Sequence, residues 1–98
     1  MEKYQRIAVK VAKMGLFSDI HNCGAPTVNN PVNLYCNRPD GLTIYIEEGL
    51  RGKNQWSVDY TYDPNVRMRS AMDTISGMGT QKAMFEVVQK IIDGEYRK

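Results

Sequence analysis

The chain has 98 residues, of which 42% are hydrophobic and 24% are charged, a balance typical of a globular protein and not of a disordered one. This length predicts one small domain spanning residues 1–98, with a single core and no room for a second. The formal net charge of +2 is too small to indicate a polyanionic partner by itself.

Residues 2–14 predict an amphipathic helix. Their apolar side chains recur at helical spacing and share one face: Tyr4, Ile7, Ala8, Val11 and Met14. Gly15 is suited to end the helix, because glycine adopts the left-handed conformation without steric penalty. A column of four cations lies beside the apolar face: Lys3, Arg6, Lys10 and Lys13. With Glu2 these give the segment a charge of +3, so the rest of the chain sums to −1.

The N-terminus and the cysteines predict a soluble, cytoplasmic protein. No apolar run approaches the roughly 18 residues of a membrane span, and cations interrupt the stretch where a secretory signal would be apolar. Cys23 and Cys36 are the only cysteines, too few for a disulfide framework. We expect free thiols, while a single bridge or a metal site stays open.

Residues 16–31 predict a long, partly ordered loop. The segment lacks periodicity and is rich in turn-forming residues: Gly24, Pro26, Asn29, Asn30 and Pro31. Connections of this length are uncommon in small domains unless they carry function or contain a short unrecognised element.

From residue 32 onward, apolar side chains recur at every second position, the spacing typical of a strand. Residues 32–37 and 42–47 alternate apolar and polar side chains around a turn at Arg38–Gly41, which predicts a hairpin. After a loop at 49–54, apolar side chains again occupy every second position, at Trp56, Val58, Tyr60 and Tyr62. These segments predict three strands of an antiparallel meander.

Residues 66–75 fit either a helix or a fourth strand. A three-residue turn at 63–65 would pair Tyr60 with Met68 on one side of the sheet and Asp59 with Arg69 on the other. In that register Tyr62, Tyr60 and Trp56 face the apolar residues Val66, Met68 and Met72, and Val58 faces Ser70. Every aromatic residue of the preceding strand then lies opposite an apolar one, so the strand is favoured over the helix.

The C-terminal segment predicts a second helix. Thr80 is a natural N-cap, Met84, Phe85, Val88, Ile91 and Ile92 form an apolar stripe, and Gly94 ends the pattern. The fold class is therefore α+β: an N-terminal helix, an antiparallel meander of three to four strands, and a C-terminal helix on one sheet face. We expect both helices on the face that carries Ile44, Ile46, Trp56, Val58 and Tyr60.

Nine residues are candidates for binding a partner. Four form the basic column and the others are Tyr45, Arg51, Lys53, Arg67 and Arg69, on the open sheet face or in the loop beside it. Cations on one helix face can follow a nucleic-acid backbone, while tyrosine and arginine are enriched in protein-binding hot spots. An edge strand at 32–37 or 66–75 can also pair with a second copy and form a homodimer.

The sequence gives only weak indications of a metal, catalytic or anion-binding site. Asp19, His21, Cys23 and Cys36 include zinc-ligand types, but the second closely spaced pair of a structural site is missing. His21 and Cys23 lack an orienting third group for nucleophilic catalysis. SGMGT at 76–80 can bind an anion at a helix N-terminus, but a turn followed by a helix cap is the favoured interpretation. We therefore predict no catalytic residue, cofactor or metal.

These patterns favour a non-catalytic binding module. The leading hypothesis is a small inhibitor or adaptor that binds and modulates a larger protein or nucleoprotein machine, of the kind that a virus or mobile element can encode, although no residue demonstrates that origin. The alternative is a nucleic-acid-binding protein that uses the basic face of the N-terminal helix and the open sheet face. No membrane partner is expected.

Overall fold

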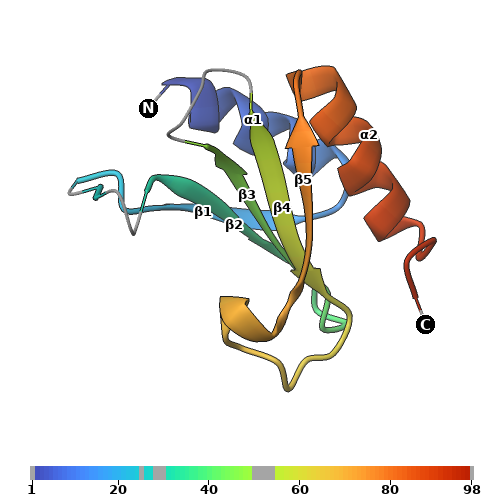
Figure 1. Ribbon diagram of the computed structural model, residues 1–98. Helices are drawn as coiled ribbons and strands as arrows, with labels where there is room; N and C mark the ends of the chain where they lie inside the picture. Colours follow the sequence, from blue (N-terminus) through green and yellow to red (C-terminus); the bar gives the residue numbers. More distant parts are fainter. Residues whose placement is uncertain (1, 25, 28–30, 50–54, 98) are drawn as a thin grey trace.

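The computed structural model describes residues 2–24, 26–27, 31–49 and 55–97. In chain order the elements are α1 (Glu2–Lys13), β1 (Phe17–His21), β2 (Asn33–Asn37), β3 (Thr43–Glu48), β4 (Trp56–Thr61), the short 3-10 helix η1 (Arg69–Ala71), β5 (Asp73–Met78) and α2 (Gln81–Ile92). Both helices lie on the same side of the sheet (Figure 1), where α1 contacts β1 and β2 and α2 contacts β4 and β5. Neither described helix is long and apolar enough to cross a membrane.

The sheet has five antiparallel strands in sequence order, β1-β2-β3-β4-β5. This confirms the α+β class, the meander and the helix on one sheet face, but three to four strands were too few. The missing strand is β1, which lies within the predicted loop and pairs Ile20 with Leu34. Its sequence FSDIH gives no clear signal, because Ile20 is the only apolar residue on the core side and Phe17 is 64% exposed.

The fourth predicted strand was placed too early. β5 begins at Asp73, and its register pairs Tyr60 with Asp73, Val58 with Ile75 and Trp56 with Met78. The extra residue between Ile75 and Met78 forms a bulge, and Gly77 has a positive φ of 81° there. Glycine before a helix usually indicates a turn, so the segment 76–79 was read as one. The edge strands are therefore β1 and β5, and the segment 32–37 is interior.

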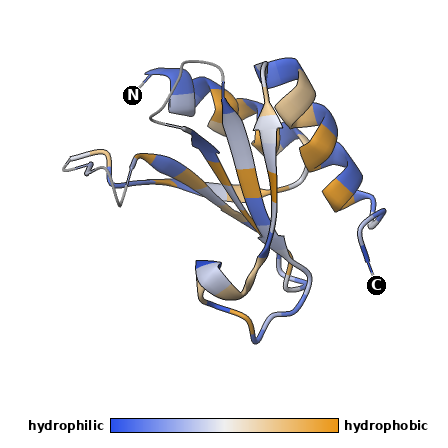
Figure 2. Cartoon of the chain, in the orientation of Figure 1, coloured by the Kyte–Doolittle hydropathy of each residue, from blue (hydrophilic) through white to orange (hydrophobic). Residues whose placement is uncertain are grey.

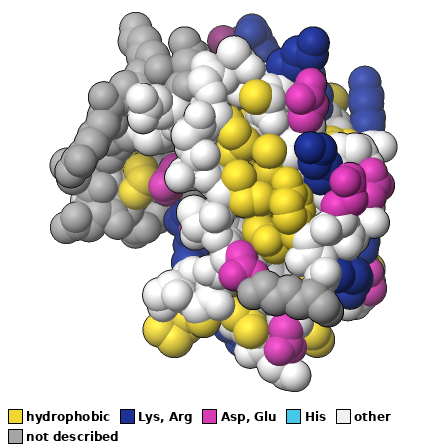
Figure 3. Space-filling model, turned by 45° about the vertical axis from the view of Figure 1, so that its right-hand side comes forward, with side chains coloured by type: hydrophobic (Ala, Val, Ile, Leu, Met, Phe, Trp, Pro, Cys, Tyr) yellow, Lys and Arg dark blue, Asp and Glu magenta, His cyan; other side chains and the backbone are white. Residues whose placement is uncertain are grey.

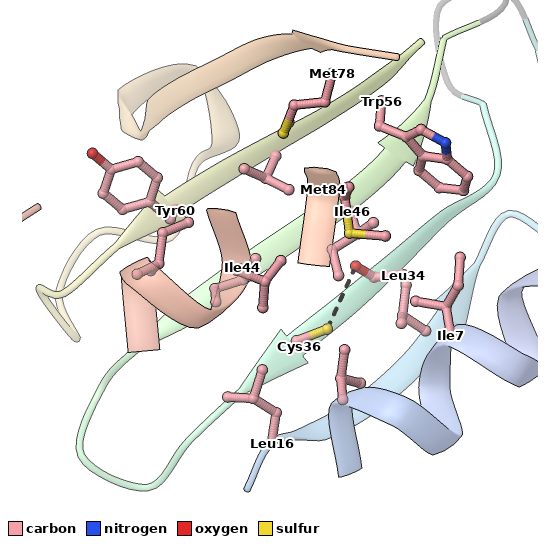
Figure 4. Packing of buried hydrophobic residues seen from close by; sticks show 14 of the residues in the cluster. Ile7, Leu16, Leu34, Cys36, Ile44, Ile46, Trp56, Tyr60, Met78 and Met84 are labelled. Carbon is pink, nitrogen blue, oxygen red and sulfur yellow. Dashed lines mark hydrogen bonds between the residues drawn. The ribbon is translucent and has the colours of Figure 1, made fainter. Parts of the chain in front are cut away.

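Alternation along the strands separates a buried face from an open one. The inward side chains of β2, β3 and β4 are fully or almost fully buried and pack against both helices, as Figure 4 shows for Leu34, Cys36, Ile44, Ile46 and Trp56. Tyr4, Ile7 and Val11 supply the α1 side of this core, and Met84, Val88 and Ile91 supply the α2 side. Figure 2 shows the matching mixture of hydrophobic and hydrophilic residues along both helices.

The helix ends follow the expected capping rules. Gly15, with φ of 93°, ends α1 in a reverse turn in which Leu16 N donates to Val11 O at 3.1 Å. Thr80 caps α2, because its Oγ1 accepts a hydrogen bond from Ala83 N at 3.1 Å. At the other end of α2, the Tyr62 hydroxyl donates to the Ile91 carbonyl oxygen at 2.6 Å, which joins the helix to the end of β4.

Candidate partner-binding surfaces

The open sheet face carries an aromatic row that begins on β1. The His21 ring stacks on Tyr35 with centroids 5.2 Å apart, and Tyr35 packs against Tyr45 at 5.1 Å. Arg69 from η1 completes the row, with its guanidinium carbon 4.8 Å from the Tyr45 ring centroid. We call these four residues the aromatic row. Because neighbouring strands fix the ring positions, the row is pre-organised before any partner arrives.

Two carboxylates hold Arg69 over the sheet. Its Nη2 lies 2.7 Å from Asp59 Oδ2 on β4, and its Nη1 lies 3.4 Å from Glu47 Oε1 on β3. Thr74 on β5 donates to the other oxygen of Asp59 at 2.6 Å. The network therefore ties three strands to the connection that precedes β5, and it neutralises the cation.

Among the described residues, the open face is not basic in sum. Asp19, Glu47 and Asp59 contribute three negative charges, against two positive charges from Arg67 and Arg69. Burial raises the pKa of Tyr45 above its ordinary value, and Tyr35 raises it further, while Arg69 lowers it. The Tyr45 hydroxyl therefore stays protonated at neutral pH, as a hydrogen-bond donor and acceptor for a partner.

A pocket of about 360 Å³ adjoins the aromatic row. The sheet provides its floor through Tyr35, Thr43 and Tyr45, and the segment between β4 and β5 provides its wall through Pro64, Val66, Arg67 and Met72. Its mixed lining of phenol rings, a hydroxyl, a guanidinium and aliphatic carbons suits a protruding amino-acid side chain.

The pocket wall is braced by a neighbouring turn. Gly41 has φ of 101°, and a Cβ placed there would lie 2.9 Å from the Pro64 Cβ. The turn at 63–66 is itself closed by a hydrogen bond from Val66 N to Asp63 O at 3.1 Å. The close approach of two turns thus fixes one side of the pocket.

The basic column of α1 lies on the other side of the sheet from the aromatic row. Lys3 Nζ pairs with Glu48 Oε1 at 2.7 Å, and Arg6 lies 3.8 Å from Glu2. Lys10 Nζ stands 5.0 Å from the Phe85 ring centroid on α2, and Lys13 lines the same groove between the helices. The predicted residues that the structure describes therefore form at least two separate surfaces.

The remaining predicted residues divide as follows. Tyr45 and Arg69 touch each other, and Arg67 is exposed beside them in the pocket wall. Arg51 and Lys53 lie outside the described residues. Sequence reasoning missed His21 and Tyr35 as part of the row. The period-two alternation of 32–37 and 42–47 puts Tyr35 and Tyr45 on the same face of the hairpin, a signal that could have found Tyr35. His21 had no such signal, because β1 was not predicted.

Cys36 and His21 lie on opposite faces of the sheet, and Cys23 follows His21 in an exposed segment. Cys36 is fully buried in the core, where its Sγ donates to the Leu34 carbonyl oxygen at 4.0 Å (Figure 4), and burial raises its pKa to about 12. His21 lies on the open face against Tyr35, and Cys23 is exposed. Within the described ranges, no three His, Cys, Asp or Glu side chains are grouped closely enough to hold a metal ion.

Comparisons with protein-family models, with curated proteins and with solved structures found no significant match to this chain. Its function therefore has to be inferred from its own surfaces. Two of them stand out by geometry: the open face with the aromatic row and pocket, and the groove between the helices.

A third, smaller feature is an apolar strip on the side of the molecule where β5 and α2 lie, bordered by charged side chains in Figure 3. Ile75 on β5 and Ala83 and Val87 on one flank of α2 are partly buried hydrophobic residues packed against the core. The bulge at Gly77 interrupts the adjoining strand edge, a feature that disfavours simple edge-to-edge pairing.

Proposed function

We propose that this protein is a cytoplasmic, non-catalytic binding module, a small inhibitor or adaptor that binds a larger protein or nucleoprotein machine through its open sheet face. The observation that carries the proposal is the aromatic row, His21, Tyr35, Tyr45 and Arg69, beside a pocket that can take an anchoring side chain.

The composition of this face is that of a protein-binding hot spot. Tyrosine and arginine dominate the binding energy of many interfaces, because they bury much surface and lose little conformational freedom. Here the rings are braced against each other and Arg69 is held by two carboxylates. A partner would meet a rigid surface and would not have to order it first.

Nucleic-acid binding is the less well supported alternative. It was predicted to combine the basic column with the open sheet face, yet these lie on opposite sides of the sheet. Lys3 and Arg6 already face Glu48 and Glu2, and the described part of the open face carries more acidic than basic groups. A polyanion gains affinity by releasing counterions to a continuous basic surface, which this arrangement does not offer.

Affinity capture from the source cell tests the proposal. The bait proteins are the wild type, Tyr45→Ala and Arg67→Glu, with Lys90→Glu as the matched control, since Lys90 is an exposed charge on α2 away from the open face. We expect one specific partner that the wild type and Lys90→Glu retain and that both open-face variants lose. Urea unfolding of each variant verifies that the fold is intact.

Nuclease treatment distinguishes the two functions. A partner that stays bound after nuclease digestion is held by protein contacts. If capture is abolished by nuclease, or if Tyr45→Ala and Arg67→Glu capture the partner at full strength, the open face is not the protein-binding surface. A labelled oligonucleotide that binds in a salt-sensitive way and is released by Arg6→Glu with Lys10→Glu would support the alternative.

A further inference from the structure

A second binding surface lies between the two helices, on the side of the sheet opposite the aromatic row. The groove is a shallow, open depression of about 560 Å³ that is lined by residues of both helices: Lys10, Lys13, Met14, Gln81, Lys82, Phe85, Glu86 and Gln89. The lining runs from Gln81 to Gln89 on α2, which at 1.5 Å per residue is about 12 Å, or a little over two helical turns.

The groove has an apolar floor and a basic rim. Met14 and Phe85 are partly buried hydrophobic residues packed against the core, and they form the floor. Three lysines and one glutamate surround them, an excess of two positive charges. Lys10 Nζ lies over the Phe85 ring, 5.0 Å from the ring centroid, so a cation–π contact holds its ammonium group directly beside the apolar floor.

From this geometry we infer that the groove binds an acidic amphipathic helix of a partner protein. A third helix laid between α1 and α2 places its apolar side chains at i, i+3, i+4 and i+7 on Met14 and Phe85. Its glutamates or aspartates then face Lys10, Lys13 and Lys82, while a single basic residue pairs with Glu86. Charge complementarity thus specifies both the sign of the charge on the partner helix and the orientation of that helix.

A nucleic acid fits this groove poorly. Phosphates need a continuous row of cations and gain nothing from an apolar floor, whereas an amphipathic helix uses both parts of the surface. The groove and the open face lie on opposite sides of the sheet, so both can be occupied at once. This second surface does not depend on the function proposed above, and it gives the protein the two contacts that an adaptor needs.

The test uses three synthetic fluorescent peptides of roughly three helical turns each. The first has leucines at i, i+3, i+4 and i+7 and glutamates at most other positions. The second is a scramble of the same composition, and the third replaces the glutamates with lysines. Anisotropy is measured with the full chain at low and moderate salt. We expect the acidic helical peptide to bind, and the scramble and lysine peptides to bind at least about tenfold more weakly.

Protein variants locate the binding. Lys10→Glu with Lys13→Glu is expected to lower the affinity for the acidic peptide at least about tenfold and to raise the affinity for the lysine peptide. Loss of folding cannot produce this reversal of charge preference. Lys90→Glu, outside the groove on α2, controls for net charge. Phe85→Ser removes the floor and is expected to weaken the acidic peptide while leaving Tyr45 and the open face intact.

Each of the following results would overturn the inference. The first is that the acidic peptide fails to bind the wild type, or that the scramble binds equally well. The second is that Lys90→Glu, which changes the net charge by half as much as the double variant does, lowers the binding free energy by half as much, which would indicate only a net-charge effect. The third is that a DNA duplex competes with the peptide for the wild type and that the double variant no longer binds the duplex, which would mean that the lysines bind phosphates.

Discussion

Arg69 Nη2 lies 2.7 Å from the carboxylate of Asp59, although Arg69 belongs to η1 and not to a strand paired with β4. The sequence predicted this ion pair from a strand register that proved wrong. The pair forms because the segment between β4 and β5 folds back over the open face. The same segment provides the wall of the pocket, so one ion pair helps to shape the candidate binding surface.

Replacing Arg69 should destabilise the protein. Arg69→Ala leaves the Asp59 and Glu47 side chains, 14% and 18% exposed, without their cation, and we expect a loss of about 1 to 3 kcal/mol in the free energy of unfolding. Urea unfolding measures it. Arg67→Ala, at an exposed site two residues away, should change the value by less than about 0.5 kcal/mol. Equal effects of the two substitutions would mean that the ion pair is not a stabilising contact.

Three glycine substitutions test how the pocket wall is braced. Gly41→Ala adds a Cβ only 2.9 Å from Pro64 at a positive φ, and should cost about 1 to 3 kcal/mol of unfolding free energy. Gly15→Ala has the positive φ but an open site, and should cost about 1 to 2 kcal/mol. Gly24→Ala has neither penalty and should be nearly neutral. A Gly41→Ala variant as stable as Gly24→Ala would show that the two turns are not closely packed.

The two thiols should differ in reactivity. Cys23 is exposed, while Cys36 is buried with a pKa of about 12, so the folded protein should react with a thiol reagent at pH 8 at one site only. In Cys23→Ser the folded protein should be unreactive, and urea should restore one reactive thiol. Rapid labelling of folded Cys23→Ser would contradict the burial of Cys36.

Cys36 should also make stability depend on alkaline pH. Its pKa is raised from 9.0 to about 12, so between these values the unfolded chain releases a proton that the folded chain retains. The stability from this group is complete below pH 9 and declines as pH rises toward 12, by up to about 1.4 kcal/mol per pH unit. Comparison with Cys36→Ala cancels the contribution of the tyrosines. Parallel pH profiles of the wild type and the variant would contradict the shift.

Sequence patterns predicted the strongly amphipathic parts of the fold. The apolar stripe of α1, the Thr80 cap and the alternation of β2, β3 and β4 all follow from local periodicity, and the structure confirms them. β1 was missed and β5 was placed too early, because edge strands have few buried side chains. On β1 only Ile20 faces the core with an apolar side chain, and on β5 Gly77 introduced a bulge that resembled a turn.

The candidate site could be predicted only in part, for a related reason. Tyr45 was found because it alternates on a predicted strand, and Arg69 because a strand register that proved wrong still placed it on the open face. The basic column was found as a pattern, but the helix periodicity cannot tell that Lys3 pairs with Glu48 or that Lys10 lies over Phe85. Those contacts depend on how the helices pack on the sheet, which links residues far apart in the chain.

The most direct test of the central claim is calorimetric titration of the captured partner against the wild type, Arg67→Glu and Lys90→Glu. Arg67 is exposed in the pocket wall, so its reversal changes the open face and leaves the core untouched. If the open face is the binding surface, Arg67→Glu should lower the affinity for the partner by about tenfold or more, while Lys90→Glu should bind the partner as the wild type does. Equal affinity of all three proteins would contradict the claim.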